Sequence, residues 1–174
     1  MNWEESAAAE TGVSEELPQG GPPRGWHWAH WLTVIAVFAG VVWVIFGQTL
    51  RFGFVPYDDP ALVTENPMVS GGLSPNGLVW AFTYQWPGGR NLSPHAGTEN
   101  LWHPLTWISH MVDATLFGID AWPGGHHATN LALHLLAALV HFGLFTKLLR
   151  SRSAAFIATL LFLVHPLHVE SVAW

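Results

Sequence analysis

The chain alternates between long apolar stretches and stretches rich in polar residues, glycine and proline. The first apolar stretch, Trp31–Phe46, contains no charged residue. A helix that crosses a bilayer needs about 20 mostly apolar residues, so we predict a first spanning helix at about 31–49. Later apolar stretches predict two more spanning helices, at about 126–146 and 153–166. The pattern is that of an all-α membrane protein with about three transmembrane helices.

A long segment at about 50–125 separates the first two predicted spans. Its first part reads as loop with short helices, one of them capped by Ser74 and started by Pro75. The stretch 101–117 has polar and apolar residues at helical spacing, with Pro104 inside it. This pattern predicts an amphipathic helix that lies in the membrane interface.

The composition is typical of a membrane protein and argues against some classes of partner and chemistry. Only 10% of the residues are charged, against about 25% in soluble domains, and tryptophan occurs 11 times. Five of the twelve acids lie in the first sixteen residues, so we predict that 1–25 form a disordered acidic tail. No basic stripe is present, which argues against a nucleic-acid partner. Cysteine is absent, which excludes disulfides and thiolate chemistry.

Charge around the second and third predicted helices sets an orientation. Lys147, Arg150 and Arg152 crowd the short loop between them, and such loops stay in the cytoplasm. The amino terminus is then cytoplasmic and the segment 50–125 is external. We therefore expect an integral membrane protein with residues 26–174 in the membrane domain; the resemblance described below implies that this is a partial polytopic domain in a bacterial inner (cytoplasmic) membrane.

Two adjacent carboxylates, Asp58 and Asp59, follow the first predicted helix. At the edge of a membrane they can meet both a lipid headgroup and an aqueous substrate, and carboxylates serve in proton transfer. The alternative interpretation is a turn, because Asp and Pro are common in turns.

Histidines supply the other candidate chemistry. His127, His134 and His141 are seven residues apart, which places them on one face of the second predicted span. They could bind a metal or haem, carry protons, or stay neutral and hydrogen-bond to neighbouring helices. The run His165-Pro166-Leu167-His168-Val169-Glu170 offers two imidazoles and a carboxylate, either for a metal or as a helix end.

Five motifs occur in order along 54–174: FVPYDDPALVTENPMV, LSPNGLVWAFT, NLWHPLTWISHMVDATLFGID, PGGHHATNLALHLLAALV and LFLVHPLHVESVAW. Together they resemble the amino-terminal part of bacterial membrane proteins that carry tetratricopeptide repeats. These are similar to the animal transmembrane-and-tetratricopeptide-repeat O-mannosyltransferases, which have the C-type glycosyltransferase fold. The resemblance implies an enzyme that transfers a mannose-like sugar from a polyprenyl-phosphate donor, a membrane lipid, to a protein or other hydroxyl acceptor outside the cytoplasm.

The resemblance also implies roles for particular residues. One of Asp58 and Asp59 would be the base that activates the acceptor hydroxyl, and the other would orient the acceptor or help to hold a divalent metal. His103, His168 and Glu170 are carried over as neighbours of the site. The family has more helices than this chain, so we expect a fragment or truncated product that is inactive alone. The alternatives are a non-catalytic membrane scaffold and a metal- or haem-binding protein that uses the heptad-spaced histidines.

Overall fold

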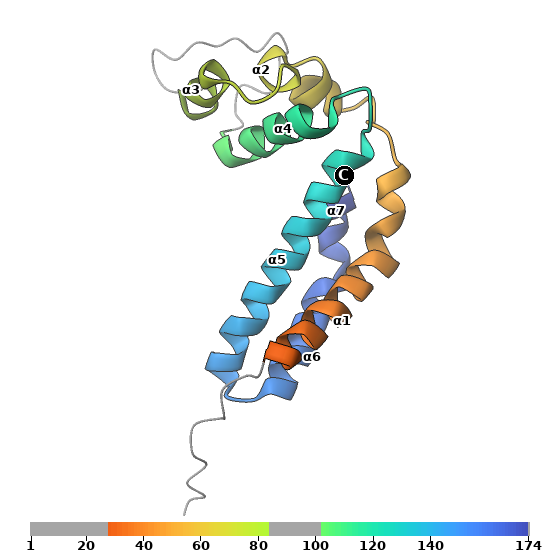
Figure 1. Cartoon of the computed structure of the whole chain (residues 1–174), viewed down its shortest axis with the longest axis vertical. Coiled ribbons are helices and arrows are strands. Elements are labelled where there is room, and N and C mark those ends of the chain that lie inside the picture. Colours follow the sequence, from red (N-terminus) through yellow and green to blue (C-terminus); the bar gives the residue numbers. More distant parts are fainter. Residues whose placement is uncertain (1–27, 84–101, 174) are drawn as a thin grey trace, which may run out of the picture.

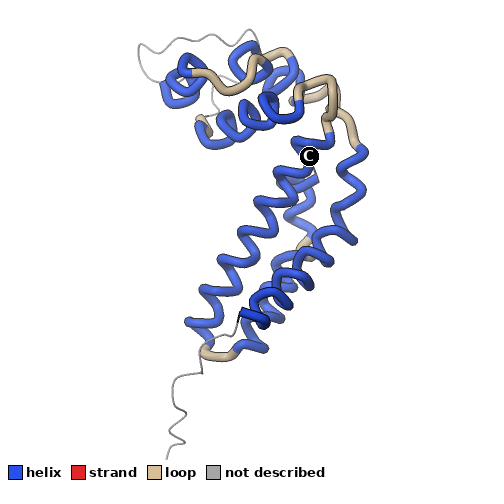
Figure 2. Tube along the Cα trace, viewed as in Figure 1, coloured by secondary structure: helices blue, strands red, loops and turns tan. Residues whose placement is uncertain are grey.

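The computed structural model describes residues 28–83 and 102–173. Every regular element in these two ranges is a helix, which confirms the all-α prediction (Figures 1 and 2). Long helices form an elongated bundle, and shorter ones form a cap at one end of it. The predicted acidic tail, 1–25, lies outside the described residues. The helices are, in order, α1 (Trp28–Phe46), η2 (Gly47–Arg51), η3 (Pro60–Thr64), α2 (Pro67–Ser70), α3 (Pro75–Thr83), α4 (Pro104–Phe117), α5 (Gly124–Leu149), α6 (Arg152–Leu163), η4 (Pro166–His168) and α7 (Val169–Ala173).

The first predicted span is confirmed as an apolar helix that begins three residues earlier than expected. α1 continues directly into the 3₁₀ turn η2, and together they form 24 residues, Trp28–Arg51, long and apolar enough to cross a membrane. Phe38 and Phe46 face the bundle and are buried, whereas Trp43 and Val44 are exposed. Apolar side chains on an outward face suit a helix that contacts lipid.

The second predicted span is α5, whose 26 residues also meet the length and composition of a membrane helix. It ends at Leu149, and the next residue, Arg150, has a left-handed backbone with φ of 50°. Ser151 then caps α6, since its Oγ accepts a hydrogen bond from the N–H of Ala154 at 3.3 Å. The turn is short, and α5 and α6 lie side by side (Figure 1).

The third predicted helix, at about 153–166, corresponds to α6, which ends a few residues earlier than expected. α6 stops at Leu163, and the segment Pro166–Ala173 continues at an angle of 50° to it. Proline has no N–H to donate and its ring clashes with the preceding turn, so the helix breaks before Pro166. A third span exists only if this bent pair of helices counts as one, which leaves two straight candidate spans in the described parts of the chain.

The cap folds around its own small core of Val63, Val69, Trp80, Ala81, Trp107 and Met111. Trp80 from α3 meets Trp107 from α4 edge to face, with ring centroids 5.1 Å apart. The predicted cap of α3 is confirmed, because the Oγ of Ser74 accepts from the N–H of Gly77 at 3.0 Å. The predicted amphipathic helix is α4, which starts at Pro104.

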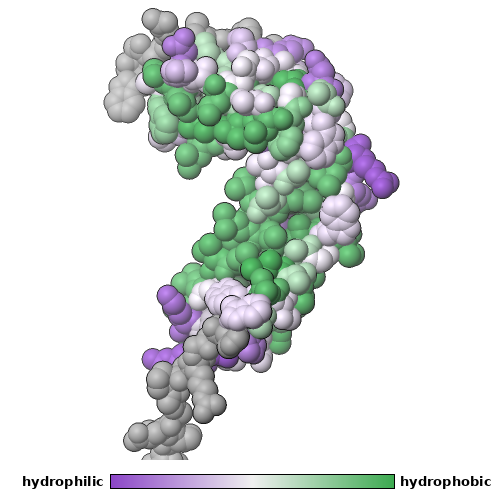
Figure 3. All heavy atoms as spheres, viewed as in Figure 1, coloured by the Kyte–Doolittle hydropathy of each residue, from purple (hydrophilic) through white to green (hydrophobic). Residues whose placement is uncertain are grey.

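Hydrophobic residues cover the visible surface of the bundle and also the side of the cap that faces it (Figure 3). Exposed apolar side chains on and beside α4 include Trp102, Leu105 and Leu116. Hydrophilic residues gather at the opposite end of the bundle and on the outer side of the cap. An exposed apolar side of this kind is typical of a helix in a membrane interface, and that position of α4 stays a prediction.

Candidate functional site

The acidic pair lies in the turn that leads from the first span into the cap. The carboxylate of Asp59 accepts a hydrogen bond from the N–H of Val55 at 2.5 Å, which closes the turn. The carbonyl oxygen of Asp58 accepts from the N–H of Leu62 at 2.9 Å and thereby starts the helical turn η3. The side chain of Asp58 is exposed, whereas Asp59 is half-buried. The two acids therefore differ: Asp59 is fixed to the backbone, and Asp58 projects from the turn.

The start of α5 lies close to this turn because two glycines permit it. A Cβ on Gly124 would lie 2.2 Å from the carbonyl oxygen of Leu50, and a Cβ on Gly125 would lie 2.2 Å from the ring of Phe117. Both distances are far below van der Waals contact, so only glycine lets α5 pack this tightly against η2 and α4. The close approach brings the next two residues, His126 and His127, to the junction of cap and bundle.

Asp59 interacts electrostatically with both of these histidines. Both imidazoles are buried, and aromatic rings cover them: Phe54 packs edge-on to His126 at 5.1 Å, and Phe52 to His127 at 6.2 Å. The structure therefore joins the acidic pair to the first turn of α5, about 70 residues later in the sequence. The sequence analysis did not predict this pairing.

Beneath the aromatic cover, His126 meets two residues of α4, His110 and Asp113. One potential ligand atom from each lies within 4.8 Å of the others. The Nδ1 of His126 is 3.7 Å from the Oδ2 of Asp113, and the imidazoles of His110 and His126 stack with centroids 5.8 Å apart. The hydroxyl of Thr129 donates to the Oδ1 of Asp113 at 2.5 Å, which fixes the carboxylate. We call His110, Asp113 and His126 the junction cluster.

Burial sets the electrostatics of the junction cluster. It raises the pKa of the Asp113 carboxyl, an effect that the hydrogen bond from Thr129 partly offsets. Burial, with a smaller contribution from the nearby His103, lowers the pKa of His110 to about 4. His110 is therefore neutral at pH 7, and one of its ring nitrogens offers a lone pair.

Sequence reasoning placed His110 and Asp113 on one helix but did not single them out as a site. The available signal was their spacing of three residues, which puts two side chains on the same helical face. The contribution of His126 could not be read from spacing, because it depends on how α5 packs against α4.

The three predicted neighbours of the acidic pair, His103, His168 and Glu170, lie in different parts of the structure. His103 lies at the start of α4, where it stacks on Trp107 at 4.8 Å and interacts electrostatically with His110. His168 contacts His134 instead, with centroids 5.3 Å apart, two helical turns along α5 from His126. Glu170 is exposed on α7. Among the three, His103 is the residue that the structure connects to the junction.

The heptad-spaced histidines each have different surroundings. The Nε2 of His134 lies 3.3 Å from the carbonyl oxygen of Leu163, at the break between α6 and η4. A carbonyl can only accept, so this nitrogen donates and the imidazole satisfies a carbonyl next to the break. The ring of His141 contacts that of Phe145 at a tilt, with centroids 4.1 Å apart, and His127 lies near Asp59. In the described segments, the group of converging metal-binding side chains is the junction cluster and not this trio.

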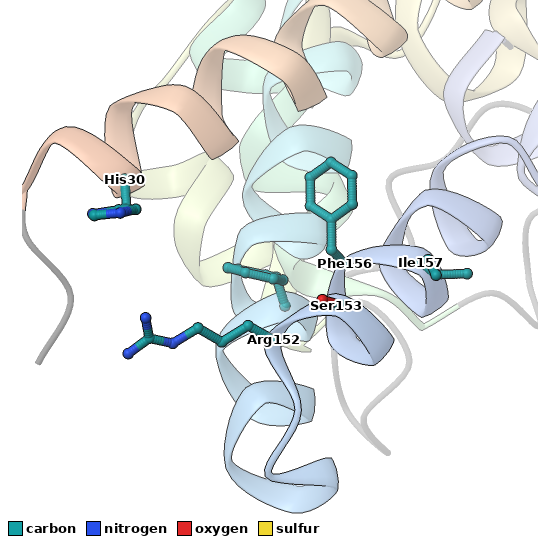
Figure 4. Close-up of a pocket in the computed structure, with 6 residues that line it drawn as sticks. His30, Arg152, Ser153, Phe156 and Ile157 are labelled. Atoms are coloured by element: carbon teal, nitrogen blue, oxygen red, sulfur yellow. The ribbon is translucent and has the colours of Figure 1, made fainter. Parts of the chain in front are cut away.

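A shallow hollow of about 440 Å³ lies at the other end of the bundle, between the start of α1 and the start of α6 (Figure 4). His30 and Arg152 line it together with Phe142 and Phe156. The hollow places the beginning of α1 beside the basic turn after α5. Both are therefore at the end of the bundle opposite the cap and the acidic pair (Figure 1).

Comparison with known proteins gives a consistent group of relatives. The chain is 34% identical over 139 residues to protein O-mannosyl-transferase TMTC1 of Mus musculus. The aligned region makes up 79% of this chain and 14% of the mouse protein. It is 31% identical over 142 residues to protein O-mannosyl-transferase Tmtc1 of Drosophila melanogaster. This aligned region makes up 82% of this chain and 16% of the fly protein. No family model matches the chain, and no solved structure matches it. The chain, which spans about one seventh of the length of these relatives, is thus a membrane protein similar to proteins named protein O-mannosyl-transferases.

Proposed function

We propose that this chain is part of a membrane glycosyltransferase that moves a mannose-like sugar from a polyprenyl-phosphate donor to a hydroxyl acceptor on the non-cytoplasmic side. The observation that carries the proposal is the similarity to protein O-mannosyl-transferases over about four fifths of the chain. The place of Asp58 and Asp59 supports it. They follow a membrane-spanning helix at the end where a lipid-borne phosphate and a water-soluble acceptor can meet.

The two acids have separate roles in this proposal. Asp58 is the base: its exposed carboxylate takes the proton of the acceptor hydroxyl. The acceptor oxygen then bonds to the anomeric carbon of the sugar, and the bond from that carbon to the phosphate oxygen breaks, which releases the polyprenyl phosphate. Asp59 positions Asp58, because its hydrogen bond with the N–H of Val55 holds the turn. The acceptor is a protein or another hydroxyl compound.

The orientation in the membrane follows from the two ends of the bundle. Arg152, which follows the basic turn after α5, lines one hollow with His30 at the start of α1, so the positive-inside rule puts the amino terminus and this turn in the cytoplasm and the cap outside. We propose the inner membrane of a bacterium as the location. Because the chain has no cysteine, a single Asp120→Cys or Ser151→Cys variant reports its own position. In intact cells an impermeant maleimide should label the first and not the second, and the reverse pattern would contradict the orientation.

The reaction itself is tested with the full-length protein that contains this chain, reconstituted in lipid vesicles. Radiolabelled polyprenyl-phosphate mannose should give a labelled acceptor, whereas a nucleotide-linked mannose should give none. Transfer from the nucleotide sugar alone would contradict the proposed donor. If correctly folded wild-type protein transfers from neither donor over a panel of hydroxyl acceptors, the non-catalytic scaffold is the better account.

A further inference from the structure

We propose that the junction cluster, His110, Asp113 and His126, binds one divalent transition-metal ion of the zinc type and thereby ties the cap to the bundle. This inference does not depend on the proposed reaction. It rests on geometry, on unsatisfied polar atoms and on ligand chemistry, in that order.

The geometry is near that of a three-ligand metal site. Two ligands of a tetrahedral zinc ion, each about 2.0–2.1 Å from the metal, are about 3.3 Å apart. The Nδ1 of His126 and the Oδ2 of Asp113 are 3.7 Å apart, and all three ligand atoms lie within 4.8 Å of one another. A separation of 3.7 Å is too long for a hydrogen bond, but it leaves space for an ion between the two atoms. Closing the site requires shifts of about 1.5 Å or less, within the reach of side-chain rotation.

His126 is the second, independent observation. Its side chain is 5% exposed, and neither of its ring nitrogens has a hydrogen-bond partner among the described residues. The Nδ1 of His110 is likewise buried and unpartnered there. Buried polar atoms in folded proteins almost always have a partner, and a metal ion would supply one for the lone pairs that converge here.

The surroundings prepare these residues to be ligands. Thr129 holds the Oδ1 of Asp113, so the Oδ2 faces His126, an arrangement typical of the groups that orient metal ligands. A cation would also compensate for the burial of the Asp113 carboxylate, and Asp59 adds negative charge near His126.

The donor set indicates which ions fit. Two imidazoles and one carboxylate suit zinc and other first-row transition metals, whereas Ca²⁺ and Mg²⁺ prefer oxygen ligands only. Three protein ligands leave a fourth position for water. Since His110 and Asp113 belong to α4 and His126 to α5, a bound ion would connect the cap directly to the bundle.

The test uses the whole chain, purified in detergent with an affinity tag that contains no histidine, stripped of metal with a chelator and titrated with Zn²⁺. We expect one ion per chain by calorimetry and elemental analysis, and a rise in the melting temperature. Cobalt should bind at the same stoichiometry with a visible absorption band. Absence of saturable zinc binding by the folded wild-type protein would overturn the proposal.

Variants identify the ligands. His126→Asn and Asp113→Asn should each weaken zinc binding at least 100-fold, since loss of even an outer partner of a metal ligand costs about 10–100-fold. His141→Asn is the matched control on α5, and it should bind as the wild type does. Asp113→Asn also removes a buried charge, so without metal it should melt higher than the wild type, whereas with saturating zinc it should melt lower. Equal zinc affinity in wild type and both junction variants would show that the metal binds elsewhere.

If a junction variant fails to fold, Thr129→Val keeps all three ligands and removes only the hydrogen bond that orients Asp113. It should fold and bind zinc about 10–100-fold more weakly. Unchanged affinity in this variant, together with unchanged cobalt absorption, would contradict the assigned geometry.

Discussion

The bundle and the cap bury their side chains in different ways. The bundle core is made almost entirely of apolar residues, with Phe38 and Phe142 meeting edge to face at 5.7 Å, and large apolar side chains also cover its outside. The cap core is smaller, centres on Trp80 and Trp107, and is bounded by capping hydrogen bonds such as that of Ser74. A helix bundle in lipid needs packing inside and apolar contacts outside, whereas the cap has a polar outer side.

The buried ionisable groups gather where these two regions meet. Asp113 belongs to the cap, and His126 and His127 belong to the bundle, yet all are within a short distance of one another beside the turn of Asp58 and Asp59. Neither region alone could keep these groups close together and shielded from water. The junction is therefore the part of the described structure where ionisable groups are held together and shielded from water.

The largest expected loss of stability is in the cap. Trp107→Ala removes a side chain that is 1% exposed, and replacing such a residue costs about 3–5 kcal/mol. The cap should become accessible to protease while the bundle remains helical in detergent. Trp102→Ala is the matched control, because Trp102 is 56% exposed. Equal protease sensitivity in the two variants would mean that the cap does not fold around Trp107.

The next largest loss of stability is expected from overpacking at the junction of cap and bundle. Gly125→Ala places a Cβ against the ring of Phe117, and overpacking of this kind costs about 1–3 kcal/mol. Gly143→Ala is the control on the same helix, where a Cβ meets nothing within 4 Å, and it should be neutral or stabilising by about 1 kcal/mol. Thermal unfolding in detergent distinguishes them. Adding Phe117→Leu to the Gly125→Ala variant should partly restore its melting temperature. If it does not, the loss of stability does not come from the contact between residue 125 and the ring of Phe117.

A smaller effect is expected within the bundle. His134→Leu removes the donor that faces the carbonyl oxygen of Leu163 at the break after α6, and a buried acceptor left unsatisfied costs about 1–3 kcal/mol. His141→Leu removes an imidazole that contacts the rings of Phe145 and Phe162, and it should cost less. The melting temperatures of the two variants would contradict this account if their order were reversed.

Much of the bundle could be predicted from the sequence because hydropathy over about 20 residues is a direct signal of a membrane helix. α1 and α5 lie within a few residues of their predicted positions. The end of α6 near Pro166 was expected, since a helix end was one interpretation of the run that begins at His165, whereas the 50° angle of the segment that follows depends on packing. In the cap, Ser74 and α4 were predicted from local patterns.

The site was less accessible to sequence reasoning. The acidic pair was singled out from its place after an apolar run, and its catalytic role stays a prediction. The meeting of Asp59 with His126 and of His126 with Asp113 depends on a tertiary contact that Gly124 and Gly125 make possible. Spacing along one helix cannot reveal side chains that come from two elements.

The central claim is that Asp58, the exposed acid of the pair at the junction, serves chemistry and not folding. It is tested most directly by sugar transfer from polyprenyl-phosphate mannose in full-length protein that carries Asp58→Asn. Loss of a catalytic base should lower transfer by about 10²–10⁴-fold. The melting temperature should change little, because substitutions of exposed residues are usually within about 0.5 kcal/mol.

Two further variants complete that measurement. Asp120→Asn changes another exposed acid in the segment that joins α4 to α5 and should leave transfer unchanged. Asp59→Asn should lower both transfer and stability, because its carboxylate holds the N–H of Val55. The account predicts that Asp58→Asn alone separates activity from stability. Full transfer by the Asp58→Asn, Asp59→Asn double variant would contradict it and leave the pair as a turn.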